Sequence, residues 1–175
     1  LPAGARLDAA ALGLLASLGY ADVAVCQCPR VAIFSTGNEV AAPGEPLPKA
    51  GIYDANRFTL MGLLAEHGAD VIDLGILPDD LNALKTALEQ AAEQSDLVIT
   101  SGGVSVGQAD FTREALEQLG RLAFWRVALR PGRPMACGWL GEKRTPFVGL
   151  PGNPVAVMVT FLQFVSPLLD RLCGQ

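Results

Sequence analysis

The chain has 175 residues, of which 50 % are hydrophobic and 18 % charged, enough to bury the core of one main domain. Its formal net charge of -5 and its pI of about 4.8 exclude a typical nucleic-acid binder, because neutralising phosphates requires a basic face that this charge balance does not supply. Any site for an anion must therefore be local.

The first residues are expected to form a leader that comes from a preceding domain. The stretch LDAAALGLLASLG is typical of a helix with Asp8 as its N-cap and Gly19 as its end. A short β-prone run at 23–25 precedes a proline and indicates a linker or an edge strand. The sequence therefore predicts a leader helix and linker over residues 1–29 and a main domain over residues 30–175.

Strand and helix patterns alternate along the main domain. Strands are expected at 31–34, 71–75, 97–100, 123–129, 135–140 and 146–150. Helices are expected at 56–67, 80–94 and 111–119, with a long apolar helix closing the chain. Parallel strands joined by right-handed crossover helices form a sheet that is covered on both faces. The sequence thus predicts an α/β fold with a mostly parallel sheet.

The four cysteines, Cys26, Cys28, Cys137 and Cys173, match neither the paired spacing of a zinc site nor a disulfide framework. They are typical of free thiols in a reducing compartment. The most apolar stretch, VAVMVTFLQFV at 155–165, is shorter than a membrane span and indicates a buried helix. We therefore expect a cytoplasmic protein that binds neither nucleic acid nor membranes.

The stretch TSGGVSVGQADFT at 100–112 is a glycine-rich turn between a predicted strand and a predicted helix. Its GVSVG segment fits the elbow of a serine hydrolase, with Ser105 as nucleophile. That chemistry needs a downstream histidine base, whereas the only histidine, His67, lies upstream in the last turn of a predicted helix and is interpreted as structural. The other functional interpretation is an anion cradle, in which the N–H groups of Gly102 and Gly103 converge on an oxyanion. The turn alone leaves this cradle and a purely structural turn equally open.

The stretch GLPGNP at 149–154 precedes the closing helix. It places Asn153 as N-cap and Pro154 at the first helical position, and Gly152 frees the backbone before them. The amino end of a helix attracts anions. Capping accounts for two of these residues, but two glycines and two prolines exceed what a cap needs, so a ligand-binding loop is slightly favoured.

Three arginines gather in the stretch FWRVALRPGRP. Alternation along a strand puts Arg126 and Arg130 on one face, and Arg133 follows a Pro-Gly turn. Guanidinium groups suit phosphate or another tetrahedral oxyanion. A solvated sheet edge guarded by charge is an equally good interpretation of this segment alone.

Carboxylates follow several predicted strands, at Glu39, at the pair Asp79 and Asp80, and at Asp110. The loops after parallel strands gather at one edge of a sheet, and carboxylates beside an anion site commonly hold Mg²⁺ that bridges to phosphate oxygens. One of Asp79 and Asp80 is equally suited to cap a helix.

Six motifs in this order and spacing, STGNEV, GIYDANR, LGILPDD, TSGGVSVGQADFT, FWRVALRPGRP and GLPGNPVAVMVTF, resemble those of the bacterial molybdopterin molybdenumtransferases, the MoeA-like family related to the C-terminal region of gephyrin. The likeness covers their molybdopterin-binding domain, from about Arg30 to the end. It implies a three-layer α/β/α sandwich of the MogA-like type. It also implies insertion of molybdate into adenylylated molybdopterin with release of AMP, Mg²⁺ as cofactor, a homodimer of the full-length protein, and the adenylyltransferase of the same pathway as a partner.

The resemblance also assigns roles to individual residues. It implies catalytic and metal-binding roles for Glu39, Asp79 and Asp110. Substrate binding is implied for a larger set in the loops: Thr36, Gly102, Gly103, Ser105, Arg126, Arg130, Arg133, Pro151, Gly152, Asn153 and Pro154. Relatives often carry lysines where this chain has the three arginines, which keeps the charge but changes the donor geometry.

Two alternatives to this function stay open. One is a molybdopterin adenylyltransferase-type domain, although the loop of that family reads T-G-G-T-G rather than SGGVSVG. The other is a non-catalytic module that binds the pterin and serves as a scaffold. The family enzyme is much longer than this chain, so we expect a piece of a longer protein that binds its ligand weakly and is inactive alone.

Overall fold

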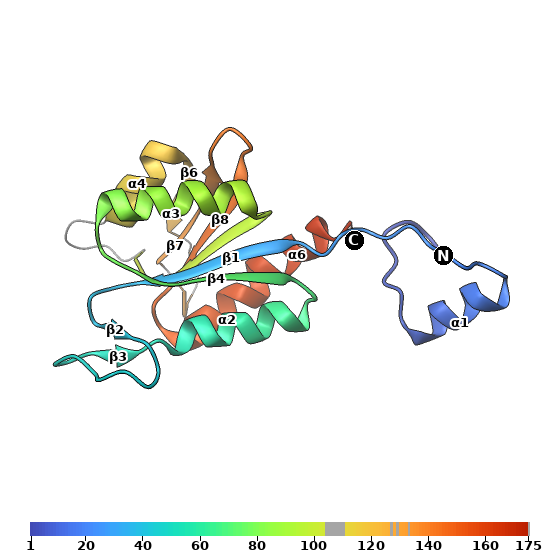
Figure 1. The fold of residues 1–175 in the computed structure, drawn as a ribbon, viewed down its shortest axis with the longest axis horizontal. Coiled ribbons are helices and arrows are strands. Elements are labelled where there is room, and N and C mark those ends of the chain that lie inside the picture. The colour runs from blue at the N-terminus through green and yellow to red at the C-terminus, as the bar shows by residue number, and fades with distance from the viewer. Residues whose placement is uncertain (104–110, 127, 129, 133, 175) are drawn as a thin grey trace.

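The computed structural model describes residues 1–103, 111–126, 128, 130–132 and 134–174. Its centre is a six-stranded sheet with the strand order β4-β1-β5-β8-β7-β6 (Figure 1). The strands are β1 Arg30–Thr36, β4 Asp70–Leu77, β5 Leu97–Ser101, β6 Gly120–Arg126, β7 Pro134–Leu140 and β8 Thr145–Leu150. The first four in the sheet order are parallel, and β7 runs antiparallel to both of its neighbours. The predicted mostly parallel sheet is confirmed.

Helices cover both faces of this sheet, which makes the predicted three-layer α/β/α sandwich (Figure 1). One layer contains α3 Leu81–Gln94 and α4 Phe111–Leu119. The other contains α2 Ala55–Glu66, α5 Pro154–Thr160, the π-helical η1 Phe161–Val165 and α6 Ser166–Leu172. The fold class expected from the alternating pattern is therefore correct.

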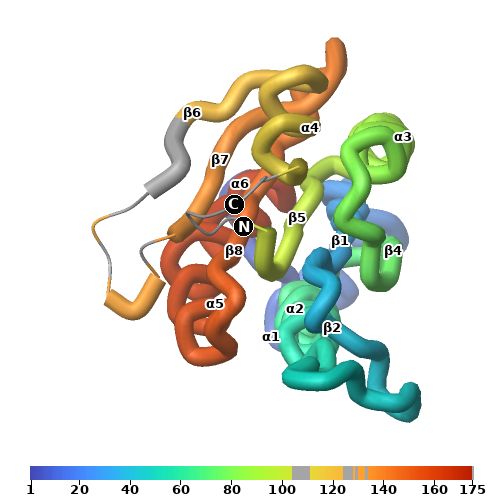
Figure 2. The backbone as a smooth tube through the Cα atoms, turned by 90° about the vertical axis from the view of Figure 1, so that its left-hand side faces the viewer, coloured from blue at the N-terminus to red at the C-terminus, as the bar shows by residue number. Residues whose placement is uncertain are grey.

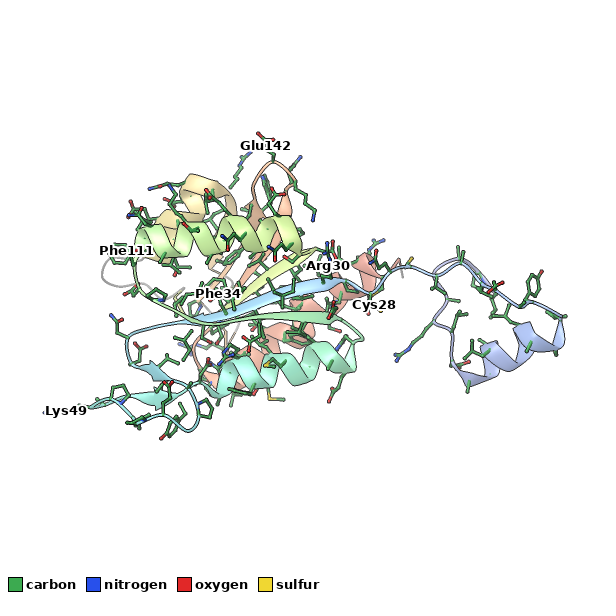
Figure 3. All side chains as sticks on the ribbon, in the orientation of Figure 1. Cys28, Arg30, Phe34, Lys49, Phe111 and Glu142 are labelled. Carbon is green, nitrogen blue, oxygen red and sulfur yellow. The ribbon has the colours of Figure 1, made fainter. Side chains whose placement is uncertain are left out.

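The two hydrophobic cores follow from alternation along β1. Val31 and Ile33 pack on the side of α2 and the closing helices, while Ala32 and Phe34 pack on the side of α3 and α4. Figure 3 shows Phe34 on the central sheet between the two helix layers, and its side chain is fully buried. Both faces of a central parallel strand are buried, which explains why its sequence is a continuous apolar run.

The closing helical run Pro154–Leu172 is long and apolar enough to cross a membrane by length and composition, so it is longer than the predicted stretch. Within the fold it is a core helix, because Phe161, Val165 and Leu169 are at most 1 % exposed and belong to the cluster beneath the sheet. His67 tethers it: Nε2 lies 2.8 Å from Ser166 Oγ, and its ring packs edge-on against Phe161. The structural role predicted for His67 is confirmed.

The leader contains one helix, α1 Ala9–Ser17, which lies away from the sheet (Figure 1). Asp8 caps it as predicted, since its Oδ1 accepts a hydrogen bond from Ala11 N at 2.8 Å. Residues 23–25 form no strand and are exposed, so the edge-strand interpretation of this run is wrong. The division of the chain after residue 29 stays a prediction.

The strand expected at 123–129 is wrong by several residues, because β6 starts at Gly120 directly after α4. A Cβ at Gly120 would lie 1.9 Å from the carbonyl oxygen of Trp139, so only glycine lets the two strands approach here. β6 ends at Arg126, so Arg130 lies beyond the strand. It lies exposed in a bend after the end of β6.

The four cysteines are free thiols, of which Cys26 and Cys28 are exposed. Burial raises the pKa of Cys137 in β7 to about 11. At pH 8 we therefore expect a disulfide reagent such as Ellman's reagent to modify Cys26 and Cys28 rapidly, and Cys137 at least about 100-fold more slowly, because the thiolate is the reactive form. The check is mass spectrometry of the labelled peptides over time.

Raising the pH toward 11 should speed the labelling of Cys137 in the folded chain and also weaken the fold. Between its ordinary pKa and about 11 the thiol is ionised only in the unfolded chain, so the free energy of unfolding falls as the pH rises through this window. Fast labelling of Cys137 at pH 8 in the folded chain would contradict its burial in β7.

Candidate functional site

A pocket of about 190 Å³ lies at the carboxyl ends of the parallel strands. Figure 2 shows that edge of the molecule from its end, with β1, β5, β8 and the start of α5 turned toward the viewer. The pocket is lined by Ser35, Thr36, Glu39, Val40, Ile52, Tyr53, Asp54, Ala55, Asn56, Ser101, Gly102, Gly103, Pro134, Gly152 and Pro154. Ligands of open parallel sheets bind at this edge, where the loops after the strands converge.

The glycine pair after β5 forms one wall of the pocket. Gly102 and Gly103 have positive φ angles of 85° and 66°, which a side chain adopts only at a cost. A Cβ at Gly103 would lie 2.5 Å from Thr36 Oγ1 and 2.8 Å from Thr112 Oγ1. The backbone of Gly103 therefore packs directly against two buried threonines, with no room for a side chain. Gly102 N donates to Leu150 O at 3.2 Å, which ties this wall to the end of β8.

The loop before α5 forms the next wall. Asn153 caps the helix through Oδ1, which accepts from Ala156 N at 3.2 Å, and Pro154 takes the first helical position, as predicted. Asn56 at the start of α2 donates from Nδ2 to Gly152 O at 2.8 Å. This bond joins the amino ends of two helices across the pocket.

The segment after β1 forms the third wall through two short strands, β2 Val40–Ala41 and β3 Ile52–Tyr53. Ile52 N donates to Glu39 O at 2.8 Å, and Gly37 leaves room for the Glu39 carboxylate, because a Cβ there would lie 2.9 Å from both carboxylate oxygens. Figure 3 shows Lys49 at the outer tip of the same segment, away from the sheet.

Buried charges stand at the start of α2. Asp54, only 3 % exposed, caps the helix through Arg57 N at 3.2 Å and accepts the Ser35 hydroxyl at 2.9 Å. Arg57 Nε donates to Asp54 Oδ2 at 2.7 Å, and Nη1 donates to Asp73 in β4. Burial alone would lower the pKa of Arg57, but the hydrogen bonds and charges of the two aspartates raise it above its ordinary value.

The structure brings several of the predicted site residues together. The pocket is lined by Thr36, Glu39, Gly102, Gly103, Gly152 and Pro154. Pro151 and Asn153 belong to the same loop as the last two but do not line the pocket. The gathering of loops at one sheet edge, expected from a parallel sheet, therefore holds for these residues.

Other predicted residues lie elsewhere. Asp79 is exposed and does not line the pocket, while Asp80 caps α3 through Ala83 N at 2.8 Å, so Asp80 takes the capping role. Arg130 is exposed and Arg126 ends β6 opposite Pro134, which does line the pocket. The side chain of Arg126, and the residues Ser105, Asp110 and Arg133, lie outside what the structure describes.

Sequence reasoning missed Ser35, Asp54, Asn56 and Arg57 as parts of the site. The stretch GIYDANR carried a signal for these residues: Asp54 precedes a predicted helix, and Arg57 follows it three residues later. Helix capping accounts for Asp54, but nothing in the sequence states that Arg57 is buried. An arginine that is 6 % exposed has to be paired, and its partners mark the network.

The charged side chains of the described pocket lining are all acidic. This lining contains the carboxylates of Glu39 and Asp54 and no lysine or arginine, so any oxyanion at this part of the pocket meets backbone N–H groups and hydroxyls. The described residues also contain no group of three His, Cys, Asp or Glu placed to hold a metal. A single carboxylate that shares Mg²⁺ with substrate phosphates is a different arrangement, and Glu39 fits it.

Fold and site together define a molybdopterin-binding domain, because residues 32–171 match the family model described as "probable molybdopterin binding domain". The chain belongs to that family and is homologous to the molybdopterin molybdenumtransferases, whose Haemophilus influenzae member is 50 % identical to it over the whole chain. A Dictyostelium discoideum gephyrin is 36 % identical over 98 % of the chain. The resemblance seen in the six motifs is confirmed.

Solved structures agree with the fold. A molybdopterin biosynthesis protein of the moeA type from Pyrococcus horikoshii is 36 % identical, with a TM-score of 0.85 over 99 % of this chain and 43 % of its own. A molybdenum cofactor biosynthesis protein B is 21 % identical with a TM-score of 0.63, which shows the shared fold alone. The chain spans 43 % of the Haemophilus relative and 27 % of the gephyrin.

Proposed function

We propose that this chain is the molybdopterin-binding part of an enzyme of molybdenum cofactor biosynthesis, which inserts molybdate into adenylylated molybdopterin and releases AMP. The observation that carries the proposal is the convergence of the glycine pair, the loop before α5 and Glu39 on one pocket in a chain of this family. The relatives named molybdopterin molybdenumtransferase support it.

The proposed roles follow from the chemistry of each wall. The N–H of Gly103 and the hydroxyl of Thr36 suit the oxygens of the pterin phosphate as donors, while Gly102, whose own N–H is bonded to Leu150 O, shapes the same wall. Gly152 and Pro154 shape the wall where we place molybdate. Arg126, whose backbone stands opposite the pocket residue Pro134, and Arg130 are proposed to offset the negative charge of the bound oxyanions.

We propose Mg²⁺ as the cofactor, held by Glu39 together with substrate oxygens, with Asp79 and Asp110 as further acidic residues. When bound, the ion offsets charge on the phosphoanhydride. We expect Mg²⁺ to strengthen molybdopterin binding by about tenfold through the Glu39 carboxylate, and Glu39→Gln to remove this gain. The check is calorimetric titration with and without Mg²⁺. A gain that persists in Glu39→Gln would exclude the proposed ligand.

Two further proposals concern the protein in the cell. The complete protein is proposed to be a cytoplasmic homodimer that receives its substrate from the adenylyltransferase of the same pathway. Exposed apolar side chains of the closing helix, Val155, Met158 and Leu162, support an interface on that face, and free cysteines fit a reducing compartment.

The experiment that tests the proposed function compares this chain with a longer protein that contains it. Each is incubated with adenylylated molybdopterin, molybdate and Mg²⁺, and AMP is measured. We expect AMP release from the longer protein and binding without turnover by the chain alone. A longer protein that binds the pterin but releases no AMP would favour the scaffold alternative, and one that adenylylates molybdopterin with ATP would favour the adenylyltransferase alternative.

A further inference from the structure

A buried arginine connects the pocket to the outermost strand of the sheet. Arg57 is 6 % exposed, and its guanidinium donates to Asp54 at 2.7 Å and to Asp73 in β4. Asp54 lines the pocket and Asp73 does not. The planar guanidinium presents N–H groups in fixed directions, so it holds the two carboxylates in a fixed relation that a flexible ammonium would not enforce.

Each of the two carboxylates also accepts a hydrogen bond from a second residue. Asp54 accepts the hydroxyl of Ser35, another pocket residue, at 2.9 Å. Asp73 Oδ1 accepts from Gly75 N at 2.9 Å, and Gly75 has a φ of 73°. The pairing of β1 with β4 shifts register between Ile33 and Ser35, so this glycine stands at an irregularity in the ladder.

We infer that Arg57 is a positioning residue for the proposed site, and that Asp73, although outside the pocket, sets the affinity for molybdopterin through it. Releasing Asp73 leaves the guanidinium with one carboxylate partner and frees the irregular part of β4 next to β1. Arg57 then holds Asp54 without its second anchor, so the carboxylate that accepts the Ser35 hydroxyl is positioned less firmly. This inference rests on the proposed function, because molybdopterin is the ligand whose affinity is measured.

The test is anaerobic calorimetric titration of molybdopterin into the chain and into Asp73→Asn. We expect the affinity to fall about tenfold, since asparagine carries no charge and offers one acceptor oxygen to the two donors Arg57 Nη1 and Gly75 N, and part of this effect reaches the pocket. The matched control is Asp96→Asn at the opposite, amino end of the sheet, where Asp96 accepts from Arg30 N at 2.8 Å. The side chains of Asp73 and Asp96 are similarly exposed, at 33 % and 39 %, and the control should leave the affinity unchanged.

Arg57→Lys provides the second variant and separates positioning from loss of stability. If Arg57 transmits the effect, Asp73→Asn weakens binding in the original chain but has little further effect in Arg57→Lys. Equal affinity of Asp73→Asn and the original chain, or effects that simply add in the double variant, would overturn the inference while leaving the pterin site intact. Failure of the original folded chain to bind molybdopterin would overturn the proposed function and this inference together.

Discussion

Replacing Asp54 by alanine is expected to lower the free energy of unfolding by about 3–5 kcal/mol, because it leaves Arg57 buried without its main partner. Asp54 is 3 % exposed and accepts from the Arg57 guanidinium at 2.7 Å. The same change removes the N-cap of α2 and the partner of the Ser35 hydroxyl. Since domains are typically stable by about 5–15 kcal/mol, this loss is large, and urea unfolding of both chains measures it.

The matched control is Asp80→Ala, which removes another N-cap aspartate. Asp80 accepts from Ala83 N at 2.8 Å, is exposed and has no ion pair among the described contacts. We expect it to cost about 0.5–2 kcal/mol, the usual value of a cap. Equal losses for the two variants would mean that the Asp54–Arg57 pair adds nothing beyond capping.

Replacing Gly103 by alanine is expected to cost about 2–5 kcal/mol of stability and to weaken molybdopterin binding by at least tenfold. The φ of 66° is unfavourable for alanine, and its Cβ would lie 2.5 Å from Thr36 Oγ1 and 2.8 Å from Thr112 Oγ1. Both threonines are buried, so the strain moves the pocket residue Thr36 or the glycine wall itself. Thermal unfolding and calorimetric titration measure the two effects.

Gly68→Ala separates backbone strain from the steric clash. Gly68 has a φ of 72°, close to that of Gly103, and a Cβ there meets nothing within 4 Å. We expect a loss of about 1–2 kcal/mol in stability and no change in affinity. If Gly103→Ala behaved like Gly68→Ala in both measurements, the tight packing between Thr36 and Thr112 would have no role in the site.

The helices were predictable from the sequence because their signals are local. The expected helix at 111–119 matches α4, and Asp80 marks the start of α3 by its cap. The order of the strands is not local: β8 inserts between β5 and β7 through pairings that no periodicity encodes. The two-residue strands β2 and β3 are too short for alternation to show, and the early start of β6 depends on contact between Gly120 and Trp139.

The positions of site residues were predictable where the order of the parallel strands alone brings their loops together. Thr36 ends β1, and Gly102 and Gly152 follow β5 and β8; these parallel strands are neighbours in the sheet, so the three residues meet. Asp79 follows β4, the outermost strand, and lies beyond the described wall of the pocket. Arg57 was missed because its burial results from packing and pairing with a distant aspartate, which residue types and spacing do not reveal.

The measurement that tests the central claim most directly is anaerobic calorimetric titration of molybdopterin, with Mg²⁺, into the 175-residue chain and its Gly103→Ala and Gly68→Ala variants. We predict saturable binding to one site, weakened in Gly103→Ala and unchanged in Gly68→Ala. Absence of binding by a chain that circular dichroism shows to be folded, or equal binding by all three proteins, would contradict a molybdopterin site at the carboxyl ends of β1, β5 and β8.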